Sequence, residues 1–143
     1  MLSSHRVEYI VVGAHALAVA GRPRATQDLD IFVEPHPQNA ARLAQALREF
    51  GFPALAEEAH RFAEPDRMAT LGTPPLQIDV MTSITGVTFE EARAGRVVAN
   101  MGEVQVPFLG PEELRRNKRA SGRPKDIADL ALLAELDPAG GEP

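Results

Sequence analysis

Three aspartates stand among strongly apolar neighbours: Asp28 and Asp30 in QDLDIFV, and Asp79 in QIDVM. Aspartate is depleted in β-strands, so its place in strand-like sequence needs a reason. Residues two apart on a strand point the same way, with Cα atoms roughly 6 to 7 Å apart, so Asp28 and Asp30 share a face. If the strand that carries Asp79 is adjacent, three carboxylates converge, and charges so close require a cation or a bound proton.

A hard divalent cation with oxygen ligands would satisfy such a cluster, and Mg²⁺ is the natural choice where phosphates supply further ligands. Two Mg²⁺ ions, or Mn²⁺ in their place, about 4 Å apart could activate an attacking oxygen and stabilise a leaving pyrophosphate. The plain alternative is a set of solvated residues on the open face of a sheet. The third aspartate, together with a glycine turn upstream, favours the metal site.

That turn is Gly13-Ala14, which follows the apolar run VEYIVV and precedes an alanine-rich segment. Free backbone N–H groups at a strand-to-helix junction bind anions such as phosphate. An ordinary tight turn would explain the dipeptide equally well.

Positive charge gathers late in the chain, where six of the 15 Lys and Arg residues lie between Arg115 and Lys125. The net charge of −5 argues against a non-specific, basic nucleic-acid binder. The local patch could still face phosphates or RNA. A solvated helix face is the alternative.

Hydrophobic periodicity predicts the elements that position these residues. We predict strands at residues 7–12, 29–33, 68–71, 76–81, 96–99 and 104–109. We predict helices at residues 14–20, 39–50, 88–94 and 111–119, a last helix from Pro124 onward, and an ambiguous stretch at 53–66. In the last helix, the spacing predicts a buried face made of Ile127, Leu130, Ala131 and Ala134.

This order of elements predicts one α/β (α+β) domain over residues 1–136, a mixed twisted sheet flanked by helices, with a disordered tail at 137–143. With no cysteine, the sequence excludes disulfides and thiolate catalysis. It shows neither a membrane-spanning apolar run nor a signal peptide, so we expect a soluble cytoplasmic protein without a membrane partner.

The motif order resembles the DNA polymerase β-like nucleotidyltransferase superfamily: apolar residues and Gly13-Ala14, then Asp28-Leu29-Asp30, then Ile78-Asp79-Val80. More narrowly, three stretches are similar to small bacterial and archaeal members related to the AbiEii-type toxin nucleotidyltransferases. These stretches are GRPRATQDLDIFV, IDVMTSITGVTFEEA and LRRNKRASGRPKDIADL. The resemblance covers about residues 9–133.

The resemblance implies a nucleotidyltransferase fold and metal-dependent transfer of a nucleoside monophosphate from an NTP, such as ATP, to an acceptor hydroxyl. Asp28 and Asp30 would bind both metal ions. Asp79 would complete one metal site and help deprotonate the acceptor, which could be RNA or tRNA, a protein or a small molecule. A toxin–antitoxin-like setting, with a partner protein or a second copy of the chain, is the implied context.

The same resemblance implies phosphate-binding residues. Gly13 and Ala14 would hold the β- and γ-phosphates through backbone N–H groups. Lys118, with Arg123 and Lys125, would neutralise the triphosphate charge.

Two further positions have a supporting role. Thr26 would support the site or bond locally, and Asp126 matches an acidic position of the last motif. One departure matters: the superfamily usually has Gly-Gly or Gly-Ser where this chain has Gly13-Ala14, and alanine lacks both the hydroxyl and the freedom of glycine. A second hypothesis is therefore a catalytically weak or inactive nucleotide-binding module, and a third is a Mg²⁺-dependent phosphohydrolase.

Overall fold

The structure is a computed structural model and describes residues 2, 5–13, 16, 28–73 and 76–136. It contains one six-stranded sheet with the strand order β3-β4-β2-β1-β6-β5. The strands are β1 (Tyr9–Val12), β2 (Asp28–Val33), β3 (Met68–Thr73), β4 (Leu76–Met81), β5 (Val97–Met101) and β6 (Val104–Phe108). β2 pairs with β4, and β1 with β6, in parallel, whereas the remaining pairs are antiparallel. The mixed sheet is as predicted.

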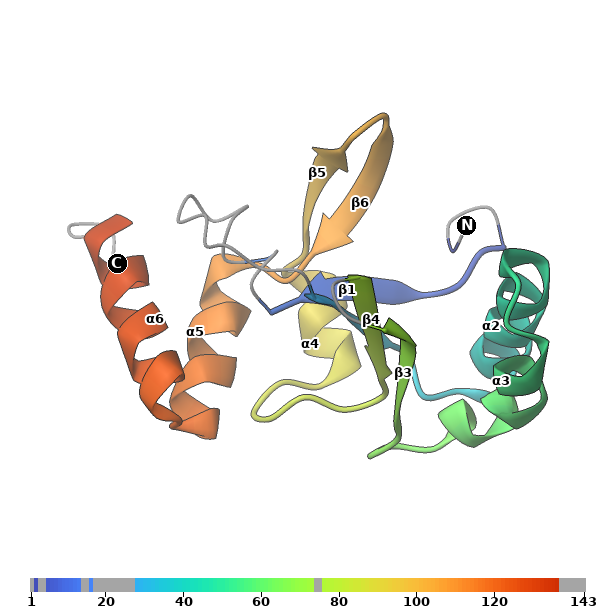
Figure 1. Cartoon of the computed structure of the whole chain (residues 1–143). Coiled ribbons are helices and arrows are strands. Elements are labelled where there is room, and N and C mark those ends of the chain that lie inside the picture. The colour runs from blue at the N-terminus through green and yellow to red at the C-terminus, as the bar shows by residue number, and fades with distance from the viewer. Residues whose placement is uncertain (1, 3–4, 14–15, 17–27, 74–75, 137–143) are drawn as a thin grey trace.

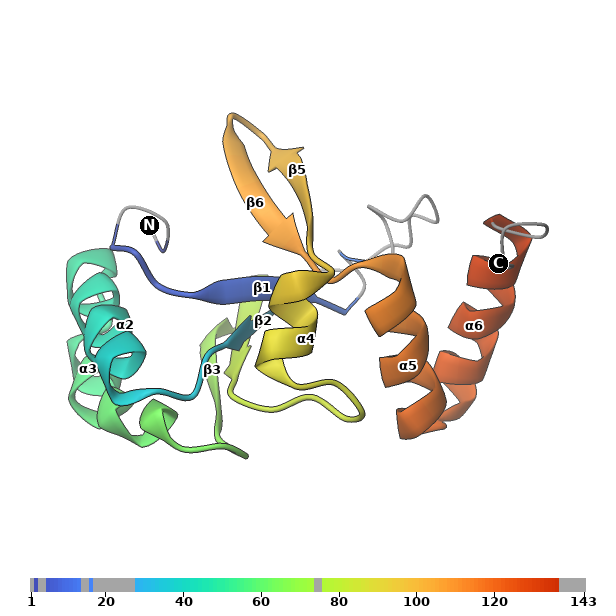
Figure 2. The same ribbon diagram turned by 180° about the vertical axis from the view of Figure 1, so that it is seen from behind.

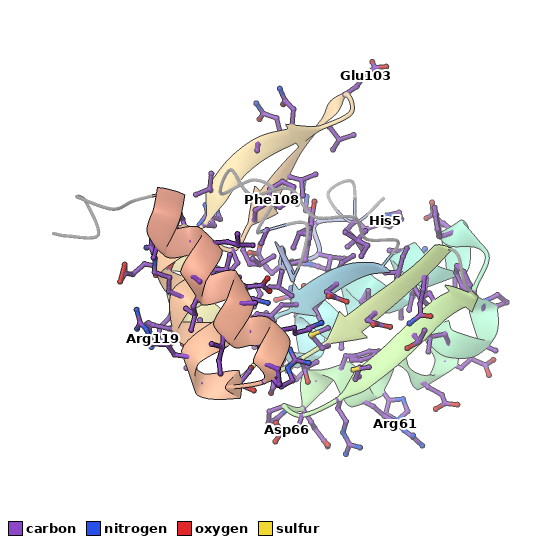
Figure 3. All side chains as sticks on the ribbon, turned by 60° about the vertical axis from the view of Figure 1, so that its left-hand side comes forward. His5, Arg61, Asp66, Glu103, Phe108 and Arg119 are labelled. Carbon is purple, nitrogen blue, oxygen red and sulfur yellow. The ribbon has the colours of Figure 1, made fainter. Side chains whose placement is uncertain are left out.

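The described helices gather at the two ends of this sheet (Figure 1). α2 (Pro37–Phe50), α3 (Pro53–Glu58) and a 3₁₀ turn, η1 (Ala59–Ala63), lie at one end. α5 (Pro111–Ser121) and α6 (Pro124–Leu136) lie at the other end, and α4 (Phe89–Ala94) crosses in front of β1 and β2 in the view of Figure 2. The β5–β6 hairpin extends away from the body, with Glu103 at its tip (Figure 3). The helix predicted at 14–20 and the tail at 137–143 fall outside the described residues, apart from Ala16.

Local sequence explains where these helices begin and end. In α4, Thr88 and Glu91 form a capping box, because the hydroxyl of Thr88 accepts from the Glu91 N–H and the Glu91 carboxylate accepts from the Thr88 N–H. α2 ends at Gly51 and α5 ends at Gly122, both with positive φ (101° and 66°), a conformation that glycine adopts without strain. The ambiguous stretch at 53–66 folds as α3 and η1.

Apolar cores lie on both faces of the sheet, and β2 contributes to the main core on each face. Ile31 and Val33 face the core under α2 and α3, whereas Phe32 faces the core under α4 and α5. There Phe32 meets the ring of Phe89 edge-on, with 5.1 Å between the ring centroids. Asp30 lies two residues before Phe32 and therefore on the same face of the sheet. Alternation along one strand thus carries this carboxylate just beyond the edge of the second core.

The predicted buried face of α6 is wrong at three of its four positions, and Leu130 is half-buried. Ile127 is 60% exposed, and Ala131 and Ala134 are exposed as well. Among the α6 side chains that the structure describes, those of Asp126, Asp129 and Leu133 are buried. Within the described part of the chain, none of the helices has the length and apolar character needed to cross a membrane.

Candidate functional site

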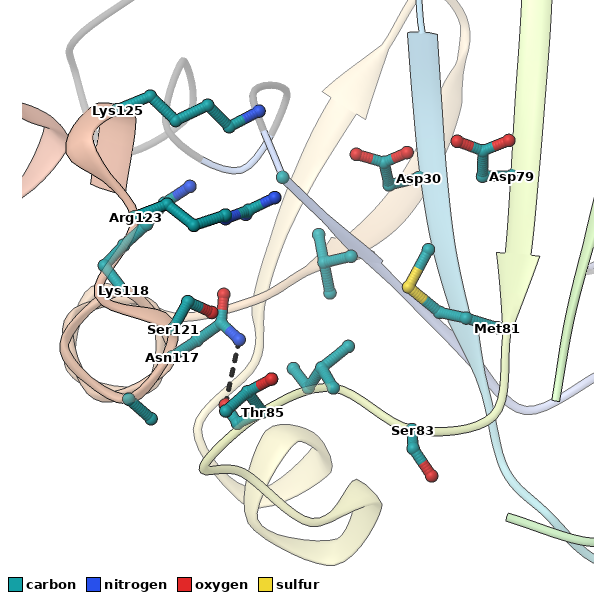
Figure 4. Close-up of a pocket in the computed structure, with 14 residues that line it drawn as sticks. Asp30, Asp79, Met81, Ser83, Thr85, Asn117, Lys118, Ser121, Arg123 and Lys125 are labelled. Carbon is teal, nitrogen blue, oxygen red and sulfur yellow. Dashed lines mark hydrogen bonds between the residues drawn. The ribbon is translucent and has the colours of Figure 1, made fainter. Parts of the chain in front are cut away.

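The central feature of the site is a pair of carboxylates on neighbouring strands. In the parallel register of β2 and β4, Asp30 lies directly beside Asp79, and Asp28 lies beside Gln77. Both Asp30 and Asp79 are half-buried, and both line a cleft of about 630 Å³ (Figure 4). The strand of Asp79 is therefore adjacent to the D-x-D strand, which is the arrangement that convergence of the three aspartates requires.

The described part of Asp28 is its backbone in β2; its side chain falls outside the described residues. Among the described side chains, no group of three or more His, Asp or Glu residues is close enough to hold a metal ion. The pair Asp30 and Asp79 nevertheless offers only oxygen ligands from adjacent positions, which is the donor chemistry that Mg²⁺ prefers. These residues therefore fit a Mg²⁺ site that Asp28 would complete.

Gly13 closes the end of β1 against this pair. Its φ is +74°, and a Cβ at this position would collide with a carboxylate oxygen of Asp30 and lie 3.2 Å from the Asp30 Cγ. Glycine is thus required twice, by the backbone conformation and by the close approach. Ala14 and Thr26 fall outside the described residues.

The opposite wall of the cleft comes from α5 and α6 and carries the predicted cations (Figure 4). The side chain of Arg123 is 60% exposed, yet its guanidinium is held by Asp126, with Nε 2.7 Å from Oδ2 and Nη2 3.3 Å from Oδ1. Lys125 is exposed at the first turn of α6. These two cations can meet an anionic ligand from the side opposite Asp30 and Asp79.

Lys118 lies on the same wall, in contact with two buried aspartates. The residue lines the cleft but is only 4% exposed. Its Nζ lies 3.3 Å from Oδ1 of Asp126 and 3.2 Å from Oδ2 of Asp129, and the exposed fractions of these aspartates are 0% and 1%. Because two buried carboxylates need a counterion, the charge of Lys118 is committed to the protein interior rather than left for a triphosphate.

Asp126 thus holds both Lys118 and Arg123 in place, and these two cations shift the pKa of its carboxyl. Burial raises the pKa of the Asp126 carboxyl, but hydrogen bonds from Arg123 and Lys118, and the charges of both, outweigh burial and leave the pKa below its ordinary value. The hydrogen bond with Asp126 raises the pKa of Arg123, and the charge of Asp30 adds a smaller effect in the same direction. Arg123 therefore interacts electrostatically with a residue on each wall of the cleft, Asp126 and Asp30.

Sequence reasoning missed Asp129 and the loop that forms the floor of the cleft. The floor contains Ser83, Ile84 and Thr85, between β4 and α4. Asn117 on α5 fixes this loop by donating from Nδ2 to the carbonyl oxygen of Thr85 at 2.9 Å (Figure 4). The loop contact joins residues 32 positions apart and leaves no local pattern. Asp129 did leave one, because it lies one helical turn after Asp126.

Comparisons with known proteins agree with this architecture. The model of the DUF6036 family, described as nucleotidyltransferases of unknown function, matches residues 1–137. No curated protein sequence matches the chain.

Two solved structures have a similar fold. A proposed nucleotidyltransferase from Thermotoga maritima is 14% identical with a TM-score of 0.54, and the match covers 94% of this chain and 86% of that one. The lincosamide antibiotic adenylyltransferase LnuA, in a structure with bound lincomycin, is 15% identical with a TM-score of 0.52, over 94% of this chain and 90% of that one. At this identity the likeness concerns the fold alone.

Proposed function

Because the chain belongs to this DUF6036 family of nucleotidyltransferases, we propose that it moves a nucleoside monophosphate from an NTP to an acceptor hydroxyl and releases pyrophosphate. The observation that carries the proposal is the cleft itself. Asp30 and Asp79 lie side by side on one wall, and Arg123 and Lys125 line the other. A triphosphate with bound Mg²⁺ needs both kinds of wall, carboxylates for the cation and positive side chains for the phosphates.

On the strand wall, Asp28, Asp30 and Asp79 would hold Mg²⁺, with Mn²⁺ as a substitute. When bound, the cation supplies neutralisation of the phosphate charge and polarises the phosphorus for attack. Asp79 would accept the proton of the acceptor hydroxyl, as a carboxylate within reach can. The acceptor oxygen forms a bond to the α-phosphorus, and the bond from that phosphorus to the pyrophosphate oxygen breaks.

On the helix wall, Arg123 and Lys125 would bind the leaving pyrophosphate. Arg123 suits this role because Asp126 fixes its guanidinium before any ligand arrives, which lowers the entropy lost on binding. Gly13 leaves room for the carboxylate of Asp30 because it has no side chain of its own, and its backbone N–H at the end of β1 would bind a phosphate. Lys118 would act indirectly, by keeping Asp126 charged.

The more specific versions of this proposal differ in the molecule that accepts the nucleoside monophosphate. RNA, a protein hydroxyl and a small molecule all carry a suitable oxygen, and the toxin–antitoxin-like setting would add a partner protein. The test incubates the chain with Mg²⁺ or Mn²⁺ and each NTP, labelled at the α- or γ-phosphate, together with tRNA, cell lysate or a hydroxyl-bearing antibiotic. Transfer predicts α-label on one acceptor class and γ-label in pyrophosphate.

The matched variants are Asp79→Asn and Asp66→Asn. Asp66 is exposed, lies outside the cleft and has a φ of 63°, a conformation that asparagine tolerates. Asp79→Asn should abolish transfer, whereas Asp66→Asn should leave it unchanged. Equal transfer by both variants would sink the proposal, and γ-label released as inorganic phosphate would indicate a phosphohydrolase instead.

The second candidate, a module that binds nucleotide without turnover, is favoured by Ala14, which replaces the glycine or serine usual at that position. It predicts NTP binding with no pyrophosphate release. The variant Ala14→Ser tests it directly, because restored transfer would show that this one position limits the activity.

A further inference from the structure

Asp79 is held by two neighbours that the proposed chemistry does not use. Thr70 donates from Oγ1 to Oδ1 of Asp79 at 2.8 Å, and Gln77 donates from Nε2 to the same oxygen at 3.3 Å. Within the described part of the chain, the hydrogen bonds of Asp79 therefore both end on Oδ1. The second oxygen, Oδ2, is left for another ligand.

The sheet brings these residues together by register. Thr70 is the antiparallel partner of Asp79 on β3, the edge strand. Gln77 precedes Asp79 by two positions on β4 and so lies on the same face, beside Asp28 of β2. The neighbouring residues Ala69 and Leu71 pack on the opposite side, against the core under α2 and α3. Thr70 is exposed and contributes little to that core, so its hydroxyl contact is what distinguishes the position.

An exposed carboxylate that is not held rotates among several orientations, and ordering it on cation binding costs conformational entropy. Groups that hydrogen-bond to a ligand carboxylate remove that cost in advance, and their loss typically weakens metal binding 10- to 100-fold. We infer that Thr70, assisted by Gln77, is a positioning residue: it fixes the carboxylate of Asp79 so that Oδ2 is ready for a divalent cation.

This inference rests on the proposed function, because it assumes that Asp79 is a metal ligand. The test uses Mn²⁺ alone as the probe, titrated into the full chain without nucleotide and followed by electron paramagnetic resonance. Thr70→Val keeps the shape and the β-branch of the side chain and removes only the hydroxyl. Thr70→Ser restores the hydroxyl. Asp79→Asn reports whether Asp79 is a ligand at all.

We expect Thr70→Val to raise the Kd for Mn²⁺ about 10-fold and Thr70→Ser to remain within about 2-fold of the parent chain. Thermal unfolding should be the same for both variants. Provided that Asp79→Asn weakens Mn²⁺ binding, two results would overturn the inference. One is unchanged Mn²⁺ affinity in Thr70→Val, and the other is equal weakening in Thr70→Val and Thr70→Ser. If Asp79→Asn binds Mn²⁺ as well as the parent chain, the metal site of the proposed function fails first.

Discussion

The two walls of the cleft hold their charges in opposite ways. On the strand wall, Asp30 and Asp79 are half-buried side by side, with their charges directed to the cleft. On the helix wall, Lys118 is buried between Asp126 and Asp129, so that the charges compensate one another inside the protein. The first arrangement presents neighbouring carboxylates to the cleft, whereas the second pairs its carboxylates with a buried lysine.

Arg123 connects these two arrangements. It is bound to the buried Asp126, yet more than half of its side chain remains exposed beside the cleft. The basic segment from Arg115 to Lys125 therefore divides between two tasks, pairing with buried carboxylates and facing the cleft. In the proposed division, Lys118 stabilises and orients the helix wall, and Arg123 with Lys125 would bind the ligand. If this division is correct, charges on the strand wall affect activity alone, and the buried cluster affects stability first.

The largest effect expected is on activity, from Asp30→Asn. Loss of an indirect, supporting contact to a metal typically costs 10- to 100-fold, so loss of a direct ligand should lower kcat/KM at least about 100-fold. The free energy of unfolding should not fall, because one of two neighbouring like charges is removed. Initial rates of pyrophosphate release and urea unfolding measure the two quantities. A variant that keeps a tenth of the activity, or one that unfolds more easily, contradicts the division.

The next effect is on stability, from Lys118→Met. Removing one partner of a buried ion pair leaves uncompensated charge and typically costs about 3–5 kcal/mol. Urea unfolding should show this loss. Arg119→Met is the matched control, since Arg119 is exposed on the same helix (Figure 3), and a surface change of this kind stays within about 0.5 kcal/mol.

A second variant keeps this prediction testable if Lys118→Met fails to fold. Replacing a whole buried ion cluster is often far less costly than breaking it. The triple variant Lys118→Met, Asp126→Asn, Asp129→Asn should therefore be more stable than Lys118→Met alone. Equal or lower stability of the triple variant would show that the cluster is not the reason for the loss.

The sequence predicted the sheet and most helix boundaries, because these depend on local patterns. Thr88 and Glu91 announce the start of α4 three residues apart, and Gly51 and Gly122 mark the ends of α2 and α5. The adjacency of the D-x-D strand and the strand of Asp79 was only a condition of the predicted metal site, and the sheet supplies it. The register that sets Asp30 beside Asp79 needs the assembled sheet.

What the sequence could not supply is the partner of a buried charge. Periodicity counts apolar residues, so it placed Ile127 on the buried face and did not predict that the aspartates of α6 are buried. The fold reverses this because Lys118, on another helix, holds Asp126 and Asp129. Contacts of this kind join residues on separate helices, and the spacing of apolar residues does not record them.

A smaller effect is expected from acid. The pKa of Asp126 is lowered in the folded chain, so its contribution to stability is complete above the unfolded aspartate value of about 3.9 and is lost as the pH falls through the lower folded value. The free energy of unfolding should therefore fall more steeply in the parent chain than in Asp126→Asn below about pH 4, by at most about 1.4 kcal/mol per pH unit.

The comparison with Asp126→Asn isolates this one group. Three glutamates whose pKa values are also lowered titrate in both proteins and cancel in the difference: Glu49, Glu64 and Glu91. Parallel stability curves for the two proteins between pH 5 and the acid limit would mean that Asp126 carries no such linkage. Packing rather than ion pairing would then stabilise the arrangement of the helix wall.

The smallest effect is predicted for Ile127→Ser, which sharpens the contrast between pattern and packing. Ile127 is 60% exposed, and isoleucine and serine have similar helix propensities, so the free energy of unfolding should change by less than about 0.5 kcal/mol. Leu133→Ala, on the buried side of the same helix, should cost about 2–5 kcal/mol. A loss above about 1 kcal/mol in Ile127→Ser would mean that this face is covered in solution. Sedimentation of the parent chain would then show whether a second copy covers it. A monomeric parent chain would mean that the loss of stability arises within one copy.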